Sequence, residues 1–169
     1  MTVHAPEAIT VCNIYLPENA PVTRFNLESL VHQLPLPFIF LGDFNAHDRL
    51  WGSTAGQCNR RGRILSSFIC DHNLVLLNNG EKTRFNSFSG DFSTIDLCIL
   101  LTSLVNKLTL SIHDDRSGSD HYPLLIRREQ IFTAMFLDQA VGLSEKRIGT
   151  VLRQILATCG IRTATVYQT

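Results

Sequence analysis

The sequence predicts an α/β protein in which packed β-sheets are flanked by helices. Short β-branched or apolar runs bounded by turn residues dominate the chain, and such runs are typical of strands. Two longer segments instead repeat apolar residues at the i, i+3, i+4, i+7 spacing of an amphipathic helix. The chain has 169 residues, of which 44% are hydrophobic and 18% are charged, so it can bury a core.

The first part of the chain alternates between strand and helix patterns. Ala8–Leu16 is apolar, β-branched and followed by a proline, which predicts a buried strand. Thr23 is expected to cap a helix that ends before Pro35. Phe38–Leu41 is wholly apolar and predicts a central strand, and residues 43–59 predict a long polar loop.

The next part is dominated by strands. Arg61–His72 repeats the helical spacing and predicts a second helix. Further strands are predicted at Leu74–Leu77, Thr83–Phe85, Thr94–Leu100, Lys107–Ile112 and His121–Ile126. Helices are thus interleaved with strands only in the first half, as expected for packed sheets with a few covering helices.

The character of the sequence changes after Arg128. We expect one domain over residues 1–128 and an unrelated tail over residues 129–169. In the tail, Ser144 is expected to cap a helix at about 144–157. This helix could cover apolar surface of the domain or could lie in solvent.

Charge and cysteine content disfavour several classes of protein. Fifteen Lys and Arg balance fifteen Asp and Glu, so the net charge is zero. This weakens the interpretation of the chain as a protein that binds mainly by wrapping polyanions, although a bound metal could supply local positive charge at a phosphate site. No apolar stretch is long enough to span a membrane, and no signal peptide is recognisable. The five cysteines form no C-x-x-C pair, which favours reduced thiols of an intracellular protein over zinc or disulfides.

Polar side chains occur in or directly after apolar strands. A charge in such a place is costly unless it is paired, hydrogen-bonded or bound to metal. Several of them at the ends of neighbouring strands indicate one shared polar site. The candidate residues are Tyr15, Asp43, Asn45, Asp96, Asp120 and His121.

Each candidate also has a purely structural interpretation. Asp43 alone would more often form an Asx-turn, and Asp96 alone could pair with an arginine. His121 alone would more often be a satisfied structural histidine, and Tyr15 a core or rim aromatic. The combination is far less expected by chance than any one member. His47 shows no comparable placement and is interpreted as a loop residue.

At this point the sequence resembles a known family. Leu41–Asn45 (LGDFN), Ser93–Leu97 (STIDL) and Ser119–His121 (SDH), in this order, resemble motifs of the endonuclease/exonuclease/phosphatase superfamily. Trp51–Ser53 and Asn59–Arg63 narrow the resemblance to the endonuclease domain of non-LTR retrotransposon polyproteins, particularly the jockey-like type. Trp51–Ser53 and Arg61–Arg63 argue against a phosphatase or phospholipase branch of the superfamily.

The resemblance implies a fold and a chemistry. The fold would be a partial four-layer sandwich of two packed, mainly antiparallel β-sheets flanked by helices. The activity would be phosphodiester hydrolysis of DNA with Mg²⁺ or Mn²⁺. By position, Asp43 would orient or deprotonate the attacking water, Asn45 would bind the scissile phosphate and help hold the nucleophile, and Tyr15 would supply a hydroxyl beside the phosphate.

The remaining candidates match residues on the other side of the reacting phosphate. His121 would contact a phosphate oxygen and stabilise developing charge, and Asp96 would hydrogen-bond and orient it. Asp120 would lie near the metal site. In-line attack on phosphorus needs an oriented water and neutralised non-bridging oxygens, and these residue types can supply both.

The resemblance also implies a departure. The family carries a metal-binding glutamate and an asparagine upstream of the strand that holds Tyr15, whereas Glu7 is the only carboxylate before Tyr15 here and its context does not match. We therefore expect an N-terminally truncated domain whose hydrolysis is impaired, or an inactive relic with at most a binding role. DNA is the expected partner, with no membrane and no obligate protein partner, and an active form would be nuclear.

Overall fold

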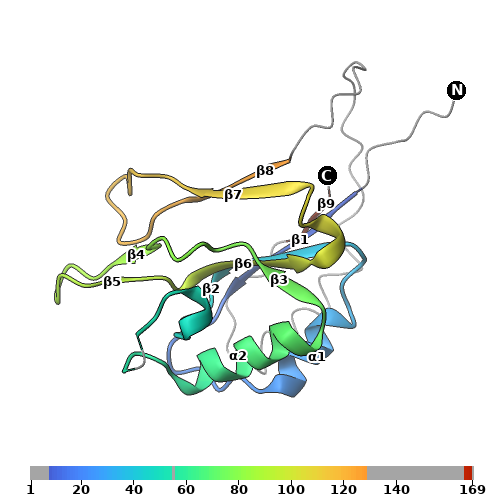
Figure 1. Ribbon diagram of the computed structural model, residues 1–169, viewed down its shortest axis with the longest axis horizontal. Helices are drawn as coiled ribbons and strands as arrows, with labels where there is room; N and C mark the ends of the chain where they lie inside the picture. The colour runs from blue at the N-terminus through green and yellow to red at the C-terminus, as the bar shows by residue number, and fades with distance from the viewer. Residues whose placement is uncertain (1–7, 55, 129–165, 169) are drawn as a thin grey trace, which may run out of the picture.

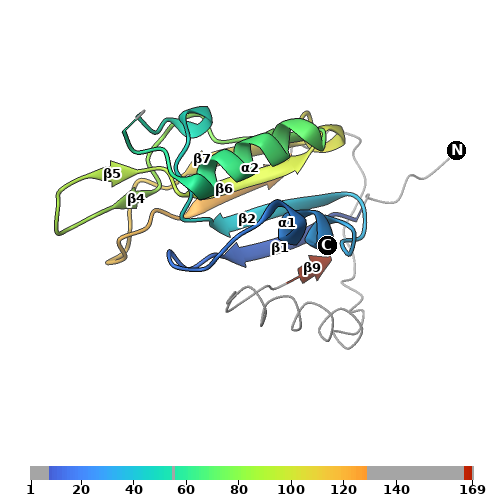
Figure 2. The same ribbon diagram turned by 90° about the horizontal axis from the view of Figure 1, so that it is seen from below.

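The computed structural model describes residues 8–54, 56–128 and 166–168 as a layered α/β fold (Figure 1). The elements are β1 (Thr10–Tyr15), α1 (Arg24–Val31), β2 (Phe38–Asp43), η1 (Arg49–Trp51), α2 (Arg60–Asp71), β3 (Leu74–Leu76), β4 (Arg84–Phe85), β5 (Phe92–Ser93), β6 (Asp96–Leu101), η2 (Thr102–Leu104), β7 (Leu108–Ile112), β8 (Leu124–Arg128) and β9 (Val166–Gln168). A five-stranded sheet of order β3-β6-β2-β1-β9 forms the middle layer. Helices α1 and α2 lie on one face of it, and the two-stranded β7–β8 sheet lies on the other (Figures 1 and 2).

This architecture confirms the predicted α/β class with packed, mainly antiparallel sheets flanked by helices. β1 and β2 run parallel, whereas β2 and β3 each pair antiparallel with β6, and β7 pairs antiparallel with β8. The described residues form three layers of the expected sandwich. Every helix and strand predicted between residues 8 and 128 has a counterpart, with bounds that differ by a few residues.

One predicted strand begins later than expected. The pattern predicted a strand over His121–Ile126, but β8 starts only at Leu124. Pro123 has no N–H to donate to a ladder. His121 instead forms an isolated bridge with Arg84, so this part of the chain crosses from β4 to β7.

The tail is described only in part. The helix predicted at about 144–157 lies outside the described residues, and the division at residue 128 stays a prediction. Strand β9 of the tail pairs antiparallel with β1, with Thr10 opposite Gln168. Residues after 128 therefore contribute an edge strand to the main sheet.

The main sheet is buried on both faces, which explains its wholly apolar strands. Along β2, Phe38 and Phe40 belong to the core beneath α1 and α2, whereas Ile39 belongs to the core beneath β7 and β8. Cys12 and Cys98 lie in these two cores, one in each. Burial raises the pKa of both thiols to about 12, so they stay protonated at neutral pH.

Both long helices begin at side-chain caps. Thr23 caps α1 as predicted, since its Oγ1 accepts from the Asn26 N–H at 3.3 Å and the Asn26 side chain accepts from the Thr23 N–H at 2.9 Å. Asn59 caps α2 by accepting from the Gly62 N–H at 2.7 Å. None of the helices that the structure describes combines the length and the apolar content needed to cross a membrane.

Candidate functional site

Strand pairing brings three of the predicted site residues into one row. Tyr15 ends β1 opposite Asp43 at the end of β2, and Asp43 lies opposite Asp96 at the start of β6. Residues that face each other across paired strands project from the same side of the sheet, about 5 Å apart at the backbone. The row therefore places a phenol and two carboxylates together at one edge of the main sheet.

His121 joins this row through Asp96. The His121 Nδ1 lies 2.9 and 3.0 Å from the two carboxylate oxygens of Asp96. Asp96 is 8% exposed, and its backbone N–H donates to the Oγ1 of buried Thr83 at 3.0 Å. A buried carboxylate that accepts from Nδ1 fixes the orientation of the imidazole ring, whose Nε2 then lies 3.8 Å from Asp120 Oδ2.

Asn45 is fixed by a tight turn after β2. It has a left-handed backbone with φ of 45°, a conformation that asparagine tolerates better than most residues. Its backbone N–H donates to Asp43 Oδ1 at 2.8 Å. Its side-chain Nδ2 donates to Asp43 Oδ2 at 2.9 Å and to the Leu16 carbonyl at 3.1 Å. Because both Nδ2 hydrogens have acceptors, the amide offers its oxygen, rather than its nitrogen, to a ligand.

The carboxyl of Asp43 is expected to lose its proton above the usual pH range for aspartate. Burial raises the Asp43 pKa most, the nearby charge of Asp96 adds to this, and the hydrogen bond from Asn45 opposes it. Since the folded-state pKa exceeds the unfolded-state value, ionisation of Asp43 lowers the stability of the fold as the pH rises through the folded pKa. Carbon-13 NMR titration of the Asp43 carboxyl would measure this pKa.

The source of the shift can be tested with matched variants. Asp96→Asn removes one raising charge and should bring the Asp43 pKa closer to the ordinary range. Asp91→Asn, on the exposed β4–β5 turn, should leave the Asp43 titration unchanged. A wild-type Asp43 that titrates in the ordinary range would contradict the burial seen in the structure.

Asp120 lies at the rim of the site and is paired with an arginine. Its Oδ2 accepts from Arg84 Nε at 3.1 Å and lies 3.8 Å from His121 Nε2. Slight burial raises the Asp120 pKa, but the Arg84 hydrogen bond and the His121 charge outweigh it, so that the net pKa is lowered. Asp120 is therefore a carboxylate at neutral pH.

The donor types of the site suit a hard divalent cation, because Asp43, Asn45 and Asp120 all offer oxygen atoms. Their placement does not complete a metal site. Among the described residues, no group of three or more His, Cys, Asp and Glu side chains is arranged to hold a metal ion. The residues that the structure describes therefore do not fit a metal ion by themselves.

Arg61, at the start of α2, hydrogen-bonds to the loops that surround the site. Its guanidinium is buried, and its two Nη groups donate to carbonyl oxygens on both sides of the site. Nη1 donates to Leu16, Phe44 and Asn45 at 3.2, 3.0 and 3.4 Å, and Nη2 donates to Pro17, Glu18 and Ala20 at 2.7, 3.0 and 2.7 Å. Arg61 thus links α2, the turn that carries Asn45 and the loop after β1.

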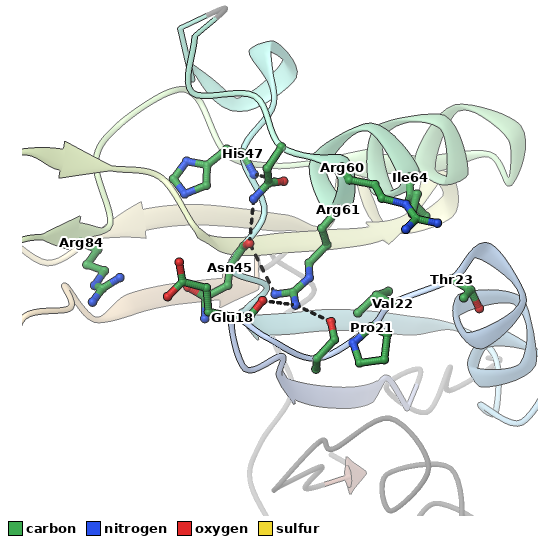
Figure 3. Close-up of a pocket in the computed structure, with 12 residues that line it drawn as sticks. Glu18, Pro21, Val22, Thr23, Asn45, His47, Arg60, Arg61, Ile64 and Arg84 are labelled. Carbon is green, nitrogen blue, oxygen red and sulfur yellow. Dashed lines mark hydrogen bonds between the residues drawn. The ribbon is translucent and has the colours of Figure 1, made fainter.

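A pocket of about 320 Å³ lies beside Asn45, between the loop after β1 and the start of α2 (Figure 3). It is lined by Glu18, Ala20, Pro21, Val22, Thr23, Asn45, His47, Asn59, Arg60, Arg61, Ile64 and Arg84. His47 is half-buried, and burial lowers its pKa, so it is neutral at physiological pH. The interpretation of His47 as a plain loop residue is incomplete, since it forms part of this pocket.

Several residues that build the site were given no role by the sequence. Arg61 carried the clearest unused signal, because it falls four residues before Leu65 and seven before Phe68, on the buried face of α2. A charged residue on an apolar helix face is costly unless it is bonded. Asn59 entered the sequence analysis only as part of the Asn59–Arg63 segment, and nothing in the sequence indicated that its side chain donates to the Asn45 carbonyl at 3.2 Å.

Comparison with known proteins agrees with this arrangement. A family model described as endonuclease–reverse transcriptase matches residues 9–125. The chain belongs to the endonuclease–reverse transcriptase family. This membership confirms the resemblance found from the LGDFN, STIDL and SDH motifs.

Two curated relatives of this endonuclease–reverse transcriptase family member come from flies. A probable RNA-directed DNA polymerase from transposon X-element of Drosophila melanogaster is 30% identical over 119 residues, covering 67% of the chain and 12% of the relative. The RNA-directed DNA polymerase from mobile element jockey of Drosophila funebris is 29% identical over 118 residues, covering 69% of the chain and 13% of the relative. The chain thus corresponds to a small part of each.

Solved structures share the fold. The endonuclease domain of TRAS1, a telomere-specific non-LTR retrotransposon, superposes with a TM-score of 0.57 at 22% identity, covering 66% of the chain and 52% of that domain. The 3′ phosphatase NExo from Neisseria, solved with a product DNA hairpin, superposes with a TM-score of 0.52 at 14% identity. This match covers 71% of the chain and 61% of NExo. The family member therefore has the fold found in these two proteins.

Proposed function

We propose that this chain carries out hydrolysis of DNA phosphodiester bonds, as the endonuclease part of a non-LTR retrotransposon protein. The observation that carries the proposal is the row of Tyr15, Asp43 and Asp96, with His121 held on Asp96 at 2.9 Å. Family membership and fold both support it.

The chain's own residues divide the work in the proposed reaction. Asp43 accepts the proton of the attacking water as the bond from oxygen to phosphorus forms, and the DNA oxygen released when the ester bond breaks takes a proton from solvent water. The Asn45 oxygen accepts a hydrogen bond from the same water, because its nitrogen is already bonded to Asp43 and Leu16. In its imidazolium form His121 donates from Nε2 as well as from Nδ1, so Nε2 and the Tyr15 hydroxyl donate to phosphate oxygens as negative charge develops there.

A requirement for Mg²⁺ or Mn²⁺ stays a prediction. A hard divalent cation would neutralise phosphate oxygens, and Asp43, Asn45 and Asp120 offer ligands of the right type. Since the described residues do not complete a metal site, we assign no step to the cation. This incompleteness favours a second candidate, a retrotransposon-derived relic that binds nucleic acid without cleaving it.

Plasmid cleavage separates the two candidates. The full chain is expected to nick supercoiled plasmid with added Mg²⁺ and to lose this activity with chelator. His121→Ala and Asp43→Ala should each lower the rate by about 10²–10³-fold, as expected when a charge-stabilising donor or a general base is removed. His32→Ala and Asp91→Ala, which change exposed residues away from the row, should cleave like wild type.

Two outcomes would contradict the enzyme. An intact plasmid in a sample whose circular dichroism shows a folded protein would favour the relic. Cleavage that survives both Asp43→Ala and His121→Ala would point to a contaminating nuclease. An active enzyme would also need access to chromosomal DNA, so we further propose a nuclear location, testable by imaging a tagged chain.

A further inference from the structure

Arg84 is a cation in the candidate site to which the reaction outlined above gives no role. It begins β4, and its backbone forms an isolated antiparallel bridge with His121. Its side chain is 35% exposed, and its Nε donates to Asp120 Oδ2 at 3.1 Å. The position is thus fixed by two contacts, one through the backbone and one through the guanidinium.

Arg84 lines the pocket together with Asn45 and His47, and its charge also reaches the neighbouring carboxylates of the candidate site. It lowers the pKa of Asp43 and of His47, in each case as a smaller contribution than burial. It also lowers the pKa of Asp120 through their hydrogen bond. Arg84 therefore supplies positive charge at the place where a phosphate would approach Asp43.

The other arginines of the pocket are less suited to this role. Arg61 uses both of its Nη groups on backbone carbonyl oxygens. Figure 3 shows Arg60 on the opposite side of the pocket from Arg84, with Asn45, His47 and Glu18 between them. Glu18 is the carboxylate among the lining residues and is outnumbered by the arginines.

We propose that Arg84 binds a DNA phosphate at the mouth of this pocket, beside Asn45, and that Asp120 holds its guanidinium in place. The inference rests on the proposed function, since it assumes DNA as the ligand. The ion pair with Asp120 uses Nε, and a guanidinium has further N–H groups that match two phosphate oxygens. Because Asp120 hydrogen-bonds only to Nε, the ion pair can stay in place while the Nη groups of Arg84 bind the phosphate. Asp120 is 49% exposed, so water can solvate the rest of its carboxylate.

The salt dependence of DNA binding tests this contact without requiring cleavage. Binding of the full chain to a short fluorescein-labelled DNA duplex is measured by anisotropy in chelator over a series of salt concentrations. Each phosphate contact by a cation contributes about 0.9 to the slope of log affinity against log salt concentration. Arg84→Gln should therefore bind more weakly and with a slope that is shallower by about 0.9.

Matched variants make the result specific. Arg84→Lys keeps the charge and should keep the wild-type slope. Arg63→Gln makes the same charge change at an exposed position of α2 that does not line the pocket, and it should also keep that slope. Arg84→Met serves as the neutral variant if circular dichroism shows that Arg84→Gln does not fold.

Different failures point to different errors. A wild-type slope in Arg84→Gln, with normal binding by the wild-type chain, would overturn the role of Arg84 and leave the proposed function standing. An equal loss of slope in Arg63→Gln would overturn it as a general charge effect. Absence of DNA binding by the folded wild-type chain would overturn both the role of Arg84 and DNA as the substrate.

Discussion

Arg61→Met is expected to lower the free energy of unfolding by about 3–5 kcal/mol, at the upper end for a single substitution. Methionine fills a similar volume but cannot donate hydrogen bonds. Each buried carbonyl that loses its hydrogen-bond partner costs about 1–3 kcal/mol. The total is smaller than the sum over all the carbonyls, because water can enter the space and hydrogen-bond to some of them. Urea denaturation followed by circular dichroism would measure the change.

Neighbouring Arg60 offers a control for this experiment. Arg60 precedes Arg61 on the same helix turn but is exposed, so Arg60→Met should change the unfolding free energy by less than about 0.5 kcal/mol. Arg61→Lys keeps the charge, but one ammonium cannot reach the carbonyls of both loops, so a large part of the loss should persist. Equal stability of Arg60→Met and Arg61→Met would show that the carbonyl contacts contribute nothing.

Gly62→Ala is expected to destabilise the protein by about 3 kcal/mol, the upper end for overpacking. Helix propensity alone predicts the opposite, since alanine is favoured over glycine within a helix by about 1 kcal/mol. A Cβ at position 62 would overlap the backbone carbonyl of His47, which no rotamer change can relieve. That carbonyl also accepts from the Asn59 N–H at 3.0 Å, so the loop could not shift without loss of this bond.

Gly56 supplies the matched glycine. A Cβ there meets no atom within 4 Å, so Gly56→Ala should be neutral or slightly stabilising. Thermal unfolding should show a lower melting temperature for Gly62→Ala and an unchanged or slightly higher one for Gly56→Ala, each relative to wild type. A melting temperature of Gly62→Ala at or above the wild-type value would show that α2 does not pack against His47 this closely.

The helices and strands were predictable because their signals are local. The apolar runs of β2 and β6 and the spacing of Leu65, Phe68 and Ile69 on α2 identify each element without reference to the others. The Thr23 cap was predictable for the same reason. The start of β8 was predicted too early, because the apolar run after His121 hid the effect of Pro123 and of the bridge to Arg84.

The site was predictable as a set of residue types but not as a geometry. Tyr15, Asp43 and Asp96 could be recognised as costly polar groups at strand ends, yet their shared row depends on strand register, which is set by packing across the sheet. The direction of the Asn45 amide follows from acceptors on Leu16 and Asp43. His47 and Arg84 line the same pocket because the fold brings together two segments that are far apart in the sequence.

By itself, therefore, the sequence determined the fold class, the family motifs and the residues able to handle a phosphate. The tertiary structure alone decided that Arg61 hydrogen-bonds to the carbonyls of two loops, that Asp120 is paired with Arg84, and that Asn45 offers its side-chain oxygen to a ligand. The physical reason is the range of the interactions. Periodicity and capping act over a few residues, whereas pairing of a buried charge or a buried amide is fixed by partners brought close only when the sheet and α2 pack together.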